Sequence, residues 1–181
     1  MRPMPLLFPQ STATFATPPS LASRGIALLA AHGDDMAWLR TLYGESRAAE
    51  LAPIPWPNEM KRSFLDSQFD LQHRHFVGQF SAGSFLIVES ARQPIGRLYL
   101  SNGDPELVVD ICIASASQNS GIGTSLLQAI LDRSSTRGVD VELHVLRHNA
   151  AAIRLYTRLG FRGVDDQGAH LLMRRAADSA S

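Results

Sequence analysis

A glycine-bearing turn at residues 118–123, Gln-Asn-Ser-Gly-Ile-Gly, constrains the fold of this chain more than any other feature. An apolar run at residues 107–113 precedes it, and a helical pattern at residues 124–137 follows it. The segment therefore predicts a strand, a tight turn and a helix start in succession. Glycine lets the backbone approach a ligand closely, and the first turn of a helix presents unpaired N–H groups with a partial positive charge. We expect an anion site here, most often one for a phosphate group.

The composition is that of an ordinary globular protein with one domain. Of the 181 residues, 45% are hydrophobic and 19% are charged. The 17 basic residues balance the 17 acidic ones, which argues against nucleic acid or an anionic membrane as a partner. The single cysteine, Cys112, excludes an intramolecular disulfide. Because no apolar stretch approaches the length of a membrane span either, we expect a cytoplasmic protein.

The chain is expected to consist of an arm, a domain and a tail. Residues 1–23 are rich in Pro, Ser, Thr and Ala, which predicts a flexible or extended arm. The domain is expected at residues 24–175, and residues 176–181 form a C-terminal tail.

Apolar periodicity and turn residues predict the elements of the domain. Asp34 and Asn58 are expected to cap two successive helices, with no strand between them. In order, we predict a strand at 25–31, a helix from 34 to the proline-rich residues 50–57, a helix at 58–75, strands at 84–89, 95–100 and 107–113, a helix at 124–137, a strand at 139–146, a helix from 149 to 160, and a closing hairpin of 161–164 and 169–174.

Two motifs on these elements resemble the signatures of the GNAT superfamily of N-acetyltransferases. Gln-x-x-Gly-x-Gly at residues 118–123 resembles its acyl-CoA signature, Gln/Arg-x-x-Gly-x-Gly/Ala. Asn-x-x-Ala-x-x-x-Tyr-x-x-x-Gly-Phe at residues 149–161 resembles its second signature, at the right spacing from the first. One departure is Ser115, where the family often has a proline, and it affects a loop conformation rather than the chemistry.

The resemblance covers residues 25–174 and implies an α/β fold of the α+β type. Its central sheet is mixed and mostly antiparallel, flanked by helices, with strands four and five splayed apart. The implied function is transfer of the acetyl group of acetyl-CoA to a primary amine, by direct attack in a ternary complex. A non-catalytic acyl-CoA-binding sensor with the same fold is the alternative. The acceptor stays open between a small-molecule amine and a protein amine, and a homodimer is possible.

The resemblance assigns acetyl-CoA to the glycine turn and the splayed strands. The backbone amides of the turn would hold the pyrophosphate, and the pantetheine arm would pair like an added strand. The N–H of Ile113 would polarise the thioester carbonyl. The other implied donor-binding residues are Ile111, Gln118, Asn119, Ser120, Gly121, Ile122, Gly123, Thr124, Asn149, Ala152 and Tyr156.

Tyr156 and Asn149 each have a structural interpretation beside the functional one. Spacing alone favours Tyr156 as a core residue, whereas the family uses the tyrosine at this place as general acid toward the departing thiolate. With pKa values of about 10 for a phenol and about 8.5 for a thiol, the tyrosine is protonated at neutral pH. Asn149 is expected to cap a helix, and the resemblance adds a contact to the donor.

The general base has several candidates. Asp110 leads because it interrupts an apolar run, and Glu106 on the same strand and Glu89 on an adjacent one follow. The alternative for Asp110 is a solvated carboxylate or an ion-pair partner. His144 can line the acceptor pocket or act as an alternative base.

Other reactive residues are expected to serve no metal or covalent chemistry. The six histidines show no metal-ligand spacing, and His73 and His75 do not share a helix face, so we expect no metal. Cys112 lies in a strand pattern and is expected to be an inert thiol rather than an acyl carrier. Trp56 can either wall the amine pocket or fill a gap in the core.

Overall fold

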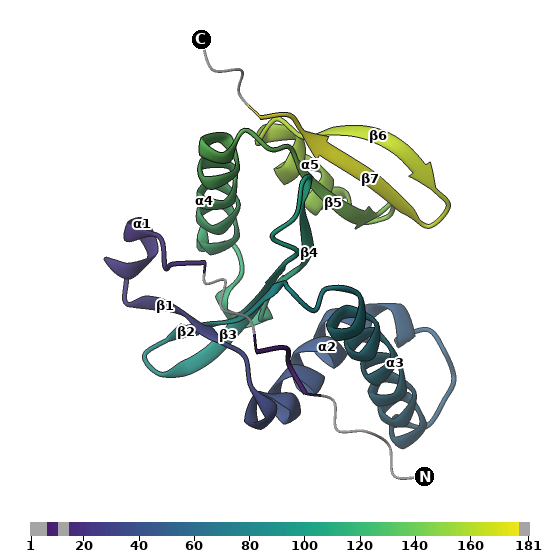
Figure 1. The fold of residues 1–181 in the computed structure, drawn as a ribbon. Helices are drawn as coiled ribbons and strands as arrows, with labels where there is room; N and C mark the ends of the chain where they lie inside the picture. The colour runs from purple at the N-terminus through teal and green to yellow at the C-terminus, as the bar shows by residue number, and fades with distance from the viewer. Residues whose placement is uncertain (1–6, 11–14, 178–181) are drawn as a thin grey trace.

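A seven-stranded mixed sheet runs through the middle of the protein, in the order β1-β2-β3-β4-β5-β7-β6 (Figure 1). The structure is a computed structural model and describes residues 7–10 and 15–177. Only β4 and β5 pair in parallel, which confirms the predicted fold class. The strands are β1 (Ile26–Ala30), β2 (Ser84–Ser90), β3 (Gln93–Leu100), β4 (Glu106–Ile113), β5 (Val141–Leu146), β6 (Arg162–Gln167) and β7 (His170–Arg175). The helices are α1 (Pro19–Ala22), α2 (Met36–Leu51), α3 (Asn58–Gln79), α4 (Ile122–Arg137) and α5 (Ala150–Arg158), with 3₁₀ turns η1 (Gly33–Asp35) and η2 (Ser115–Ser117).

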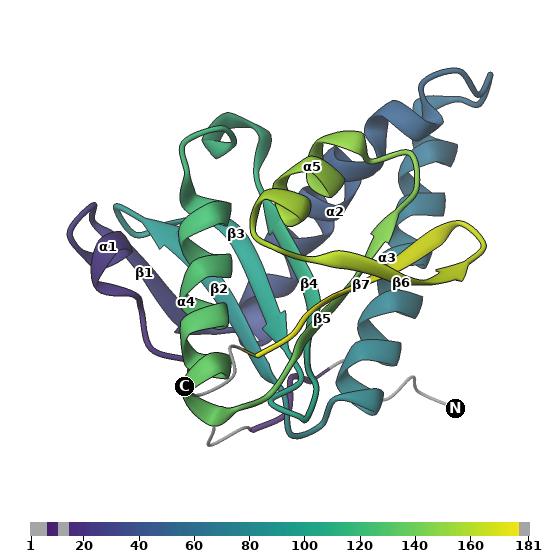
Figure 2. The same ribbon diagram turned by 90° about the horizontal axis from the view of Figure 1, so that it is seen from above.

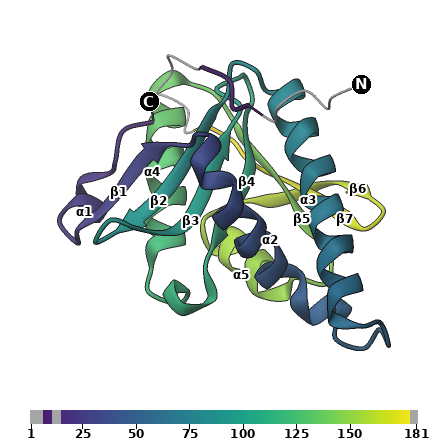
Figure 3. The ribbon, with the colours of Figure 1, turned by 90° about the horizontal axis from the view of Figure 1, so that it is seen from below.

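Helices cover both faces of the sheet. Figure 2 shows α4 and α5 on one face, and Figure 3 shows α2 and α3 on the other. The side chains of β2 contribute to the hydrophobic core on each face of the sheet, because successive side chains of a strand point to opposite faces. Leu86 and Val88 belong to the cluster under α4 and α5, whereas Phe85 and Ile87 belong to the cluster under α2 and α3.

Two predicted helix caps are wrong. Asp34 lies inside η1, and the carboxylate of Asp35 instead accepts the backbone N–H of His32 at 2.8 Å. Asn58 is the first residue of α3, with Pro57 before it and no side-chain cap. Proline fixes its own φ near the helical value and lacks the N–H that would be unpaired there, so it can begin a helix without a polar cap.

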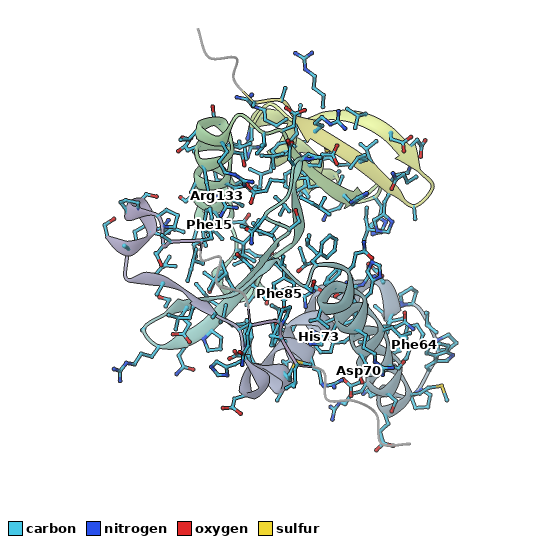
Figure 4. The ribbon with its side chains drawn as sticks, in the orientation of Figure 1. Phe15, Phe64, Asp70, His73, Phe85 and Arg133 are labelled. Atoms are coloured by element: carbon cyan, nitrogen blue, oxygen red, sulfur yellow. The ribbon has the colours of Figure 1, made fainter. Side chains whose placement is uncertain are left out.

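Residues 15–23 of the N-terminal arm pack on the α4 side of the sheet, whereas Phe8 packs on the other side, against His73, Phe85 and Tyr99. The Phe15 ring is buried, and the guanidinium of Arg133 lies 4.6 Å from its centroid (Figure 4). The hydroxyl of Thr17 accepts the backbone N–H of Leu28 at 2.9 Å, and Leu21 on α1 is fully buried. Residues 15–23 are therefore an ordered strap. Residues 1–6 and 11–14 of the predicted arm, and residues 178–181 of the predicted tail, lie outside the described residues.

Strands β4 and β5 pair over only three residues before they diverge. The pairs run from Glu106 with Val141 to Val108 with Leu143. A bulge follows at once on β4, since Leu100 of β3 pairs with Val108 and Tyr99 pairs with Asp110. Bulges turn a strand away from its neighbour and disrupt the ladder locally. The predicted splay of these two strands therefore begins at this bulge.

The diverging strands β4 and β5 enclose a wedge-shaped gap. A buried ionic cluster lies at its narrow end, where the two strands are still paired. Glu106 is fully buried, accepts the Ser134 hydroxyl at 2.7 Å and pairs with Arg137 at 3.0 Å. Arg133 completes the cluster through a second ion pair with the same carboxylate. All three partners lie in the last turns of α4, so Glu106 fastens that helix to the start of β4.

Replacing Glu106 by Ala should lower the free energy of unfolding by about 3 kcal/mol, because it leaves two neighbouring arginines without their shared counter-charge. Urea denaturation followed by circular dichroism measures the change. The control is Glu142→Ala, which breaks the partly exposed pair with Arg174 and should cost less than about 1 kcal/mol. Equal losses in both variants would contradict this role of the cluster.

Candidate active site

A cavity of about 840 Å³ opens where β4 and β5 diverge. Its walls come from α2 and α3 on one side, from the unpaired stretches of β4 and β5, and from the beginning of α5 and the turn between β6 and β7. A volume of this size is typical of small-molecule sites. Of the predicted site residues, the cavity is lined by Asp110, Ile111, Ile113, Gln118, Asn149 and Tyr156.

Backbone amides of β4 point into this wedge. The N–H of Ala114 donates to the Ile95 carbonyl at 2.8 Å, so Ala114 occupies a hydrogen-bonded position opposite β3. Along an antiparallel ladder such positions alternate with positions whose N–H points away from the partner strand. The alternation directs the N–H groups of Ile111 and Ile113 toward β5, which no longer pairs with β4 at this level. An extended ligand can bind there as an added strand.

The glycine turn continues from the end of β4 to the first turn of α4. Gly121 has φ +80° and Asn119 has φ +57°, both in the left-handed region. Apart from its two chain neighbours and the backbone of α4 itself, no heavy atom of the described residues lies within 4 Å of the position that a Cβ on Gly123 would take. The turn is thus open above the first amides of α4, as an anion site requires.

Gln118 and Ser120 hold this turn in place. The Gln118 side-chain amide donates to the Ile113 carbonyl at 2.8 Å, and the Ser120 hydroxyl donates to the Ser117 carbonyl at 2.6 Å. Gln118 therefore ties the turn to the end of β4. The anion-binding capacity is left to the backbone amides of the turn.

Asn149 caps α5, as its type and place predict. Its side-chain oxygen accepts the N–H of Ala152 at 3.1 Å. The residue also lines the cavity, and an amide side chain that accepts through its oxygen still has two N–H donors.

Tyr156 reaches the same cavity from the buried side of α5. Its side chain packs on Phe161, with ring centroids 5.9 Å apart, and is 9% exposed. Burial, with smaller contributions from Asp110 and Cys112, raises the pKa of Tyr156 to about 12. The phenol is therefore protonated at neutral pH, and both the packing and the cavity-lining interpretations hold.

Cys112 lies on β4 in the same cavity. Burial, reinforced by the charge of Asp110, raises the pKa of its thiol to about 11. At neutral pH the thiol is protonated and therefore a weak nucleophile.

An ion pair holds Asp110, which was one of the two alternatives to a catalytic role in the sequence analysis, but the partner Arg97 was not identified there. Arg97 on β3 is almost fully buried, and its Nε donates to Asp110 Oδ2 at 2.6 Å. One Nη2 N–H of Arg97 donates to the Gln72 side chain of α3 at 2.9 Å. Burial lowers the pKa of Arg97, and the Asp110 carboxylate more than offsets this, so that the pKa lies above its ordinary value. The sequence feature that could have revealed this pair is an arginine at an inward-facing position of an apolar strand. Its acidic partner, however, can be identified only from the register of the two strands.

Of the remaining candidate residues, some line the cavity and others lie outside it. Glu106 and Glu89 do not line the cavity, and Glu106 serves the ionic cluster described above. Trp56 lies before the beginning of α3 and packs edge-on against Phe64 of that helix, with 5.5 Å between ring centroids, and neither residue lines the cavity. His75 and His144 do line the cavity, together with His148 and His170.

Within the described residues no three metal-ligating side chains form a group, and no helix is long and apolar enough to cross a membrane.

Comparison with known proteins identifies the family. The model of the Acetyltransferase (GNAT) family matches residues 41–161. The chain belongs to the GNAT family. It is 41% identical over 70 residues to a mycothiol acetyltransferase of Streptosporangium roseum, a match that covers 38% of this chain and 18% of that protein.

Solved GNAT structures share the fold at low sequence identity. The PaiA N-acetyltransferase of Thermoplasma acidophilum, solved with coenzyme A, superposes with a TM-score of 0.64 at 18% identity, over 83% of this chain and 98% of that one. The ribosomal-protein-S18-alanine N-acetyltransferase of Escherichia coli has a TM-score of 0.57 at 20% identity, over 86% of this chain and 96% of that one. These likenesses show the GNAT fold and leave the substrates of this chain to the site itself.

The raised pKa of Tyr156 predicts a pH-dependent contribution to stability. Since the folded-state pKa of about 12 exceeds the ordinary pKa of 10, the unfolded chain loses this proton first. The contribution is complete below pH 10 and declines as the pH rises toward 12, by about 1.4 kcal/mol at pH 11. Urea unfolding of the wild type and Tyr156→Phe at pH 8 and pH 11 should show this change in their difference. A constant difference would contradict the raised pKa.

Proposed function

We propose that this protein transfers the acetyl group of acetyl-CoA to a primary amine by direct attack in a ternary complex. The observation that carries the proposal is the continuity of donor groups along β4. The amides of Ile111 and Ile113 face the wedge, and the open glycine turn of α4 follows directly after them. Together they suit an extended arm ending in a pyrophosphate, which describes coenzyme A and fits the family.

Each step of the transfer has a group of this chain to serve it. The Ile113 N–H would polarise the thioester carbonyl. The Ile111 N–H would donate to the same bound donor deeper in the wedge. Asp110 would accept the proton of the amine through a water molecule, because its Oδ1 has no hydrogen bond within the described residues and its side chain is 22% exposed. His144 is the alternative acceptor of that proton.

The role of Tyr156 is narrowed by its pKa of about 12. Full proton transfer from this phenol to a thiolate whose conjugate acid has a pKa of about 8.5 is unfavourable. We infer that Tyr156 stabilises the developing thiolate by donating a hydrogen bond that it keeps, and that the departing thiolate takes its proton from solvent water. The protonated thiol of Cys112 supports direct attack over an acyl-enzyme.

Replacing Tyr156 by Phe should lower kcat about 100-fold, the usual loss when one donor to a developing negative charge is removed. Affinity for acetyl-CoA should stay within about twofold, because the ring and its packing remain. Release of free thiol measures kcat, and calorimetry measures affinity.

The matched control is Cys112→Ala, which should retain turnover within about threefold since the thiol carries no acyl group. An unchanged kcat in Tyr156→Phe would contradict the role of the phenol. Loss of turnover in Cys112→Ala with trapping of an acyl-enzyme would contradict direct attack. A wild-type protein that binds acetyl-CoA and acetylates nothing would favour the sensor alternative.

The charges of the acceptor half favour a monoamine. The carboxylates that line the cavity are Asp110, paired with Arg97, and Glu50, which pairs with Arg47 at 2.8 Å and lies 3.8 Å from His148. A polyamine brings several ammonium groups, and each one that enters a partly buried site needs a carboxylate of its own. We infer an acceptor with one amine and an uncharged or anionic remainder.

A panel of amines tests both the reaction and the acceptor class. Free thiol release should be at least about tenfold faster in kcat/KM with amino acids, their amides or short peptides than with spermidine or putrescine, because the polyamines leave charges unpaired. Uncatalysed thiol release without protein is the control. Spermidine as the best substrate would overturn the monoamine assignment, while any amine-dependent turnover would support the proposed reaction.

A further inference from the structure

Arg24 lies against the glycine turn although it is distant in sequence. Its Nη2 donates to the Ser120 carbonyl at 2.7 Å, and its Nη1 lies 3.9 Å from the place of a Cβ on Gly121. The guanidinium is thus beside Gly121, the residue that immediately precedes α4. Arg24 also precedes residues 41–161, to which the family model matches.

The ordered strap positions this arginine. The N–H of Arg24 closes the turn of α1 by donating to the Leu21 carbonyl at 2.9 Å, and the Leu21 side chain is fully buried. Gly25 follows in the left-handed region with φ +71° and leads into β1. α1 packs beside α4 (Figure 1). The backbone of Arg24 is therefore held by packing.

The charge of Arg24 is available for a ligand. Its side chain is exposed, and it forms no ion pair with a carboxylate within the described part of the chain. A guanidinium has five N–H donors and binds phosphate oxygens well, so the bond to Ser120 leaves further donors for an anion at the turn. The neighbouring amides of α4 attract the same anion.

We propose that Arg24 is a donor-binding residue, one that contacts the pyrophosphate of coenzyme A at the glycine turn. The inference rests on the proposed function, since it assumes coenzyme A in the wedge. It adds Arg24, which residues 15–23 position, to the donor site. The guanidinium then has two partners, the Ser120 carbonyl that orients it and the phosphate oxygens that it neutralises.

Calorimetric binding of coenzyme A and of pantetheine, which lacks the phosphates, tests the assignment. Arg24→Ala should weaken coenzyme A about tenfold and leave pantetheine unchanged, because only the former carries the anion. The penalty should persist with dephospho-coenzyme A, which keeps the pyrophosphate. Arg62→Ala, which removes an exposed arginine of α3, is the matched control and should change neither affinity.

A second variant separates charge from support of the turn. Arg24→Gln keeps an N–H donor for the Ser120 carbonyl without the charge, and it should bind coenzyme A as weakly as Arg24→Ala. Both variants should show a flatter dependence of affinity on ionic strength than the wild type, since a charge contact is screened by salt. If Arg24 only supported the turn, its replacement would leave the dependence of affinity on ionic strength unchanged.

Three results would overturn the proposal while leaving the proposed function intact. They are wild-type affinity in Arg24→Ala, recovery of affinity with an unchanged salt dependence in Arg24→Gln, and a penalty that disappears with dephospho-coenzyme A. Failure of the wild type to bind coenzyme A would overturn the donor assignment itself, and Arg24's role with it.

Discussion

The short parallel pairing of β4 with β5 is the constraint on which the rest of the site depends. Three residue pairs hold the strands together, and the bulge on β4 then separates them. Glu106 and the arginines of α4 close the narrow end. Because that end is fixed, the amides beyond the bulge stay unpaired and face an open wedge. Because β4 and β5 stop pairing after three residues, the fold leaves room for an extended ligand to bind beside β4 as an added strand.

The sequence predicted those parts of the protein that local chemistry determines. The order of the main elements followed from apolar periodicity, and the cap at Asn149 followed from residue type. The glycine turn was visible because few residues allow a backbone with φ above zero beside a helix start. Its place between β4 and α4, with Tyr156 on the following helix, made an acyl-CoA site a specific expectation.

Contacts between distant segments could not be predicted in the same way. Asp110 and Glu106 looked alike as carboxylates in one strand, yet the bulge between them is part of a register that sequence alone does not give. Asp110 consequently meets Arg97 in the cavity, and Glu106 meets α4 in the core. Arg24 was missed for a related reason, since a segment rich in Pro, Ser and Ala gave no sign that it would pack on α4.

Opposite electrostatic arrangements at the two halves of the site follow from these contacts. At the proposed donor half, the amides of α4 and the Arg24 guanidinium present positive charge, and Arg24 forms no ion pair with a carboxylate of the described residues, which suits a pyrophosphate. At the acceptor half, each carboxylate of the cavity already has an arginine, so the pocket offers hydrogen bonds and imidazoles but little net charge. An incoming ammonium gains little there by keeping its proton. Under the proposed function, the acceptor half therefore favours the neutral amine, which is the form that can attack a thioester.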